Sequence, residues 1–276
     1  MMKAKFIALI SALLLISVSG SQVFAGAWTA KQGGMYNKLA LNYFESKKYY
    51  DDDGNRQRLA YDGKYSDTNL NCYLEYGLTD DLTLIGSFYY KWLEQENDYF
   101  KAESDGVGDF EVGLKWKLLD DPLVLAIQAL TKISGPYDDD EVPGLGNNQT
   151  DFELRLLLGK SLYPLPLYMG LEAAYRWRSK APADEWRLLA EIGGNAGKYF
   201  YGRVKLDCLF SANNAESGAG FTNITLTPEY DLITLDTTLG VNFNEHVSLE
   251  FSYVPTIYGE NTAAGYTLSS ALVYSF

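Results

Sequence analysis

The sequence predicts an all-β fold: a single antiparallel, up-and-down transmembrane β-barrel of about twelve strands. Three observations predict it. The chain begins with an export signal, apolar and polar residues alternate along most later segments, and short connections alternate with long ones. Together they favour a membrane barrel over a soluble β-sandwich or a helical membrane protein.

The first 25 residues have the three parts of a secretory signal peptide. Lys3 and Lys5 precede a mostly apolar run over residues 6–18, and small residues then lead to Ala25. The run is short for a membrane anchor, which is the alternative, because a spanning helix needs roughly 20 residues. We expect a signal-peptide helix over residues 1–25, export through the Sec pathway, and one barrel domain over residues 26–276.

Period-two alternation is clearest in residues 68–78. Leu70, Cys72 and Leu74 fall on one face, and Asn71 and Glu75 fall on the other. Similar alternation recurs in segments 82–92, 109–118, 151–162, 167–177, 185–192, 200–210, 247–253 and 266–276. We expect the apolar face, including Cys72 and Cys208, to meet lipid and the polar face to line an enclosed interior.

The connections predict the hairpin order. Short turns are expected near 79–81, 120–122, 163–164, 195–198 and 244–245, and long loops at 47–64, 93–105, 134–148, 179–184, 212–220 and 256–265. Such alternation is typical of outer-membrane barrels, with periplasmic turns and external loops. Segment 221–243 is long for one strand, and we interpret its first part as a β-rich external extension.

A soluble sandwich would also alternate, so further features decide between the two. Aromatic residues such as Trp92, Trp116 and Trp177 fall on the apolar faces, mostly near strand ends, as membrane interfaces require. The composition, with 22 Tyr and 25 Gly, suits a barrel in which alternate residues meet lipid. Since lipid leaves no backbone group hydrated, the sheet must close.

The last strand, residues 266–276, ends on Phe276 in phase with the apolar face. It resembles the C-terminal signal that the barrel-assembly machinery of Gram-negative bacteria reads. The resemblance implies that this machinery is a partner during insertion, that the last strand then pairs with the first, and that the protein resides in the outer membrane.

Three segments resemble a known family: Ala-Gly-Ala-Trp-Thr at 25–29, Tyr-Gly-Leu-Thr-Asp-Asp-Leu-Thr-Leu at 76–84, and Gly-Val-Gly-Asp at 106–109. They resemble the outer-membrane β-barrel family named for the MetA pathway of phenol degradation, and most closely its XagA-like members. The resemblance implies uptake of aromatic or hydrophobic solutes. Where the family usually has Pro-Thr-Gly, this chain has Ile-Ser-Gly-Pro at 133–136.

The polar face supplies the candidate site, because charged residues of both signs are expected to point into the barrel. These candidate pore-lining residues are Glu111, Lys115, Glu153, Arg155, Glu172, Arg176, Arg187, Glu191, Arg203, Lys205 and Asp207. Ion pairs between adjacent strands are expected. Since about twelve strands lie between filled eight-stranded and open sixteen-stranded barrels, the lumen is either a narrow channel for small solutes or a plugged, structural interior.

Acidic runs at 51–53, 94–98 and 138–141 fall in expected external loops. They suggest either divalent cations that bridge to lipopolysaccharide or a solvated surface, and the lack of regular ligand spacing favours the latter. The expected partners are thus the lipid bilayer and lipopolysaccharide, together with an unidentified small solute. A net charge of −13 argues against nucleic acid.

No motif indicates catalysis. His246 is the only histidine and falls beside an expected periplasmic turn, without a recognisable nucleophile partner. Gly106–Asp109 lacks the Lys-Ser/Thr that follows a phosphate loop, and the two cysteines form no CxxC motif. We expect no enzyme, no cofactor and no metal. A membrane-embedded hydrolase that uses inward Asp and Glu residues is left as an alternative.

Overall fold

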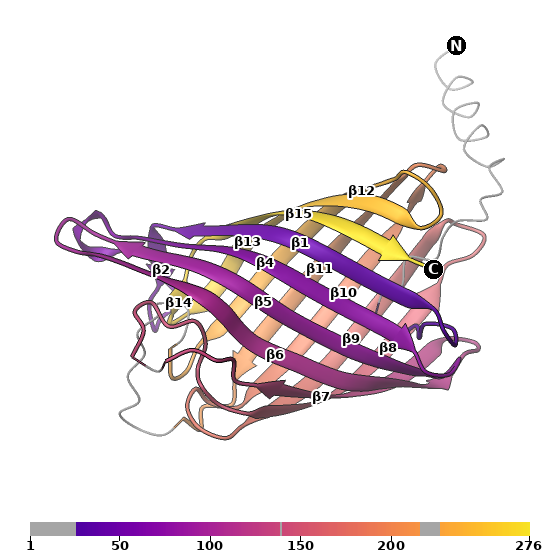
Figure 1. The fold of residues 1–276 in the computed structure, drawn as a ribbon, viewed down its shortest axis with the longest axis horizontal. Coiled ribbons are helices and arrows are strands. Elements are labelled where there is room, and N and C mark those ends of the chain that lie inside the picture. Colours follow the sequence, from indigo (N-terminus) through magenta and orange to yellow (C-terminus); the bar gives the residue numbers. More distant parts are fainter. Residues whose placement is uncertain (1–25, 139, 216–226) are drawn as a thin grey trace, which may run out of the picture.

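The computed structural model describes residues 26–138, 140–215 and 227–276. The expected signal helix over residues 1–25 lies outside this part, as do residues 221–226 of the expected external extension. Within the described part, twelve strands close into one antiparallel barrel, which confirms the predicted fold class (Figure 1). They are β1 (Met35–Ser46), β4 (Lys64–Gly77), β5 (Leu82–Glu96), β6 (Lys101–Leu119), β7 (Val124–Ile133), β8 (Asp151–Ser161), β9 (Leu167–Arg178), β10 (Glu185–Ala196), β11 (Phe200–Ser211), β12 (Asp231–Asn242), β13 (Val247–Glu260) and β15 (Tyr266–Ser275).

The first and last strands close the barrel, as the C-terminal resemblance implied. Their antiparallel register runs from Tyr36 opposite Ser275 to Glu45 opposite Tyr266. Beyond this register, the amide of Met35 donates to the carbonyl oxygen of Phe276 at 2.9 Å. The seam is therefore paired along its whole length, as a sheet in hydrocarbon requires.

The two ends of the barrel differ. Short turns over residues 78–81, 120–123, 162–166, 197–199 and 243–246 lie at the end where β1 starts and β15 finishes, and we call it the turn end (Figure 1). The opposite end, the loop end, carries a small sheet of β14 (Thr262–Ala263), β2 (Lys48–Tyr50) and β3 (Arg56–Arg58), followed by the 3-10 turn η1 (Ala60–Asp62).

Two of the predicted long loops are wrong. Strands β5 and β6 remain paired as far as Glu96 opposite Lys101, and β13 continues to Glu260, so segments 93–105 and 256–265 are largely strand. The alternating charges at these positions pair across the strands, since Lys101 Nζ lies 2.8 Å from a carboxylate oxygen of Glu94. The prediction took charged residues for a loop where they form a solvated extension of the sheet.

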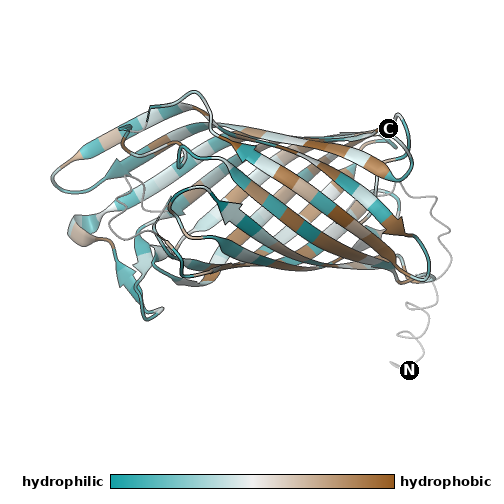
Figure 2. Ribbon diagram, turned by 90° about the horizontal axis from the view of Figure 1, so that it is seen from below, coloured by the Kyte–Doolittle hydropathy of each residue, from teal (hydrophilic) through white to brown (hydrophobic). Residues whose placement is uncertain are grey.

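The barrel exterior is apolar around its middle. Trp116, Leu156, Leu171 and Phe251 are each about half exposed, at 56 %, 46 %, 54 % and 53 %, and no other described part of the chain covers them. Figure 2 shows such residues concentrated towards the turn end, with hydrophilic residues gathered at the loop end. A soluble protein rarely exposes so wide an apolar belt, whereas a barrel in lipid requires one.

The two cysteines lie in this wall as free thiols. Cys72 sits in register with Leu39 and Phe88, both of which are exposed on the outside, so it shares their lipid-facing side as predicted. Among the described residues, no helix is long and apolar enough to cross a membrane.

Candidate functional site

Residues 26–32, which precede β1, fold into the turn end of the barrel, and we call them the inner plug. Ala27 is fully buried in an apolar cluster with Val124, Ala126 and Leu157 of the barrel wall, and Trp28 packs against this cluster. The apolar side chains on the inner surface of the wall at this end thus pack against the plug and are shielded from water.

Hydrogen bonds fix the path of the inner plug. Lys115 Nζ donates to the carbonyl oxygen of Gly26 at 3.0 Å, and the amide of Ala30 donates to Thr83 Oγ1 at 3.0 Å. Thr29 Oγ1 donates to the carbonyl oxygen of Asp80 in the β4–β5 turn at 2.8 Å. The plug is therefore held by side chains and a turn, and it takes no place in the barrel sheet.

Trp28 requires a glycine on the wall beside it. A Cβ atom on Gly159 would lie 2.7 Å from the Trp28 ring, closer than side chains come in proteins. The ring also meets Tyr168 edge to face, with centroids 5.9 Å apart. Sequence reasoning missed this role of Trp28, although an aromatic residue next to the expected cleavage site and an inward glycine were visible signals.

Glu153 is the centre of the largest charge network in the lumen. It is 1 % exposed, and its carboxylate lies 2.8 Å from both Arg155 and Arg176 and 3.3 Å from Arg187. Because β8, β9 and β10 are neighbours, the period-two pattern turns these four side chains to one face and brings them together.

The network takes in a second carboxylate on β9 and reaches across β7 to β6. Arg176 reaches a carboxylate oxygen of Glu111 on β6 at 2.9 Å, and Arg155 also pairs with Glu172. Nearer the turn end, Lys115 lies 2.9 Å from Glu75, and both side chains are buried. The lumen is thus crossed by ion pairs, not lined by isolated charges of one sign.

A second centre is Glu250 on β13, which was in the polar phase of the sequence but was not among the candidate residues. Its carboxylate lies 2.6 Å from Lys38 Nζ and 3.1 Å from Arg203, and Tyr201 donates to it at 3.0 Å. These contacts join β1, β11 and β13 across the lumen. A charged residue in phase with expected inward residues was the signal that could have found it.

The remaining candidate residues have weaker contacts. Glu191 accepts a hydrogen bond from Tyr168 at 2.7 Å, and Lys205 lies 3.6 Å from Asp236. Asp207 lies in register with Leu189 and Thr234, without an ion-pair partner within 4.0 Å among the described residues. The structure thus brings most of the eleven candidates into two clusters and leaves Asp207 apart.

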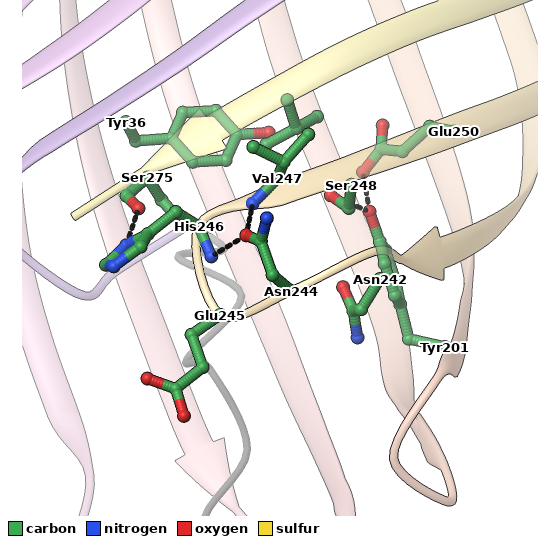
Figure 3. A pocket seen from close by; sticks show the side chains of 11 residues that line it. Tyr36, Tyr201, Asn242, Asn244, Glu245, His246, Val247, Ser248, Glu250 and Ser275 are labelled. Carbon is green, nitrogen blue, oxygen red and sulfur yellow. Dashed lines mark hydrogen bonds between the residues drawn. The ribbon is translucent and has the colours of Figure 1, made fainter.

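A pocket opens at the turn end beside the strands that carry Glu250 (Figure 3). Tyr36, Tyr201 and Ser248 line its inner part, and the β12–β13 turn with His246 forms its rim. His246 Nδ1 lies 2.8 Å from the carbonyl oxygen of Ser275, so this histidine fastens the end of β15 to the neighbouring turn. Its contacts are those of a structural residue.

The acidic run at 51–53 shapes its own loop. Asp51 accepts hydrogen bonds from the side chain of Gln57 at 3.1 Å and from the amide of Asn55 at 2.7 Å. These hydrogen bonds, that of Gln57 foremost, hold the pKa of Asp51 below its usual value. Among the described residues, no group of three or more His, Cys, Asp or Glu side chains is arranged to hold a metal ion.

The chain matches no known family model and no curated protein. It is similar in structure to the COG4313 outer membrane channel from Pseudomonas putida F1, with a TM-score of 0.74 and 18 % identity over 92 % of this chain and 100 % of that one. It is also similar to the NanC porin, with a TM-score of 0.53 and 10 % identity over 86 % of this chain and 100 % of that one. The KdgM porin follows, with a TM-score of 0.50 and 9 % identity over 86 % of this chain and 99 % of that one. At these identities the likeness establishes a shared fold, that of an outer-membrane β-barrel.

Proposed function

We propose that the protein is a narrow outer-membrane channel for small molecules whose lumen is closed at rest by the inner plug. The main supporting observation is that the inner plug is not part of the barrel sheet. The barrel closes through β1 and β15, whereas residues 26–32 are held by a few hydrogen bonds and one small apolar cluster. The plug can therefore leave the lumen without opening the sheet.

The wall behind the plug suits a hydrated passage. The eleven candidate residues carry charges of both signs, and most of them pair with an oppositely charged side chain on another strand of the barrel. A passage lined in this way is polar without a strong overall preference for anions or cations. The three similar structures named above are a channel and two porins, which supports a transport role.

We further propose membership of the family named for the MetA pathway. Two of the three resembling segments meet in space, because Thr29 of the first donates to Asp80 of the second. If the family shares this plug, the contact between the two segments explains why both of them resemble it. The aromatic or hydrophobic solutes implied by that family could be carried past Trp28 and Tyr168, which face each other at the plug.

Conductance in planar bilayers tests the channel. We compare the chain that starts at Gly26 with a variant that lacks residues 26–32, after checking by heat-modifiable electrophoresis that both are folded. The intact chain should show small or brief conductance steps, and the variant should show larger ones. If two folded proteins never conduct, the channel proposal is wrong.

The second candidate is a plugged structural or surface barrel that acts through its external loops. It is favoured by the burial of Glu153 and Glu250, each 1 % exposed within dense polar networks that occupy the lumen. The same experiment separates the two candidates, because a structural barrel would stay silent even without the plug. A change in outer-membrane permeability on deletion of residues 51–55 would then support the surface role.

A further inference from the structure

The described residues of the connection between β7 and β8, 134–138 and 140–150, fold inward at the loop end, and we call them the outer loop. The side chain of its Leu145 is 1 % exposed and packs with Tyr65 of β4 and Leu93 of β5. Since β6 lies between β7 and β5 in the barrel, the outer loop passes over β6 to reach this cluster. It therefore covers the side of the lumen next to β4, β5 and β6 at the loop end, opposite the inner plug.

Wall side chains hold the outer loop by its backbone. Lys91 Nζ of β5 donates to the carbonyl oxygen of Leu145 at 2.8 Å, and Ser104 Oγ of β6 donates to that of Pro143. Lys91 thus plays the same part at this end that Lys115 plays for the inner plug. In each case a lysine from the wall binds a carbonyl oxygen of the covering segment.

A second latch lies at the base of the outer loop. Lys132 Nζ contacts the side-chain oxygen of Asn147, and it also lies 3.0 Å from Asp109. Asp109 in turn accepts a hydrogen bond from the Tyr137 hydroxyl, which accepts one from the amide of Asn148 at 2.9 Å. Residues near both ends of the outer loop, Tyr137 at one and Asn147 at the other, are therefore tied to β6 and β7.

Another buried side chain opposes this closed arrangement. Gln149 is 4 % exposed, yet among the described residues neither its amide nitrogen nor its amide oxygen has a hydrogen-bond partner. Burying an unpaired amide is unfavourable, and water would hydrogen-bond to Gln149 if the loop moved outward.

We propose that the outer loop is a lid with two states, latched shut by Lys91 and Lys132 and driven towards opening by the hydration of Gln149. The lid narrows the lumen from outside, whereas the inner plug closes it from the periplasmic side. That the lid regulates the admission of solute rests on the proposed channel function. Its movement is a property of the loop itself.

Thiol labelling measures the lid without any need for conduction. In a Cys72→Ser, Cys208→Ser background, Leu145→Cys is exposed to a bulky, hydrophilic maleimide, and the labelling rate is followed by mass shift. The reference is Tyr99→Cys at the tip of the β5–β6 hairpin, where the native side chain is 77 % exposed. Cys at position 145 should label at least about tenfold more slowly than Cys at 99, since it reacts only in the open state.

Two further substitutions should act in opposite directions. Lys91→Met removes a latch and should speed labelling at position 145 by about tenfold, whereas Gln149→Met removes the unpaired amide and should slow it severalfold. The matched control is Lys101→Met, because Lys101 pairs with Glu94 and Glu103 and, among the described residues, forms no ion pair with the outer loop. It should leave the rate unchanged.

Three results would overturn the lid: equal labelling at positions 145 and 99, no effect of Lys91→Met, or the same direction of change for Lys91→Met and Gln149→Met. Limited proteolysis of the unsubstituted loop, with and without Lys91→Met, gives the same comparison should Leu145→Cys fail to fold. A lid that behaves as described in a barrel that never conducts would refute the channel and leave the lid standing. A conducting barrel with an immobile loop would do the reverse.

Discussion

The Nζ atom of Lys115 lies 3.0 Å from the carbonyl oxygen of Gly26 and 2.9 Å from a carboxylate oxygen of Glu75. One buried cation thus serves both the wall and the inner plug. Removing it should weaken both, because Glu75 is left charged in a buried place and Gly26 loses its donor.

Lys115→Met should therefore destabilise the folded barrel by about 3 kcal/mol, measured from its denaturant midpoint in detergent or lipid. The double variant Lys115→Met, Glu75→Gln removes the stranded charge and should recover part of this loss. Equal stability of the single variant and the unsubstituted protein would show that this pair is not buried as described.

The carboxylate of Glu153 lies within 3.3 Å of three guanidinium groups, so its charge should matter more than that of an isolated carboxylate. Glu153→Gln should lower the free energy of unfolding by about 3 kcal/mol, since Arg155, Arg176 and Arg187 lose their shared partner. The matched control is Asp207→Asn, which should change stability by less than about 0.5 kcal/mol. Similar losses for both would contradict the clustering of charge around Glu153.

The lipid-facing side can be tested at Leu156, which is 46 % exposed on the outside of the barrel. Leu156→Arg should cost about 2–4 kcal/mol in lipid, because the charge enters hydrocarbon. Leu165 lies in the β8–β9 turn at 56 % exposure, and the same change there should cost about 0–1 kcal/mol. If the two costs were equal, the apolar belt would not be in contact with hydrocarbon.

Maturation should strengthen the inner plug. We propose cleavage after Ala25, which creates a charged amino group on Gly26. Glu172 is close to that residue, since its Oε1 would lie 3.2 Å from a Cβ atom placed there. Mass spectrometry of the exported protein should give Gly26 as the first residue, and retention of Ala25 and its predecessors should raise channel conductance by releasing the plug. Unchanged conductance would exclude a role for the new amino group.

Much of the barrel could be predicted from the sequence because strand side chains alternate with period two. Runs such as 68–78 showed which face meets lipid, and neighbouring strands then brought Glu153 and Arg176 together. The inner plug and the outer loop could not be predicted in this way. Neither Trp28 nor Leu145 belongs to an alternating run, and their burial depends on contacts with distant strands.

The register between strands also limited the prediction of the site. Glu250 and Asp207 fall in the same polar phase, but only the structure shows that Glu250 meets Lys38 and Arg203 while Asp207 does not. Alternation gives the face of a side chain. Which side chains on other strands lie at the same level along the barrel axis depends on the stagger between strands.

The most direct test of the account pins the inner plug in place and releases it within one protein. The amide nitrogen of Ala30 lies 3.0 Å from Thr83 Oγ1, so plug and wall are in contact at this pair, and Ala30→Cys and Thr83→Cys are introduced there in the background without native cysteines, with disulfide formation checked by mass spectrometry. Single-channel conductance is then recorded under oxidising conditions and again after a reductant is added. The account predicts low conductance while the disulfide holds the plug and a rise on reduction. The same conductance in both states would contradict it.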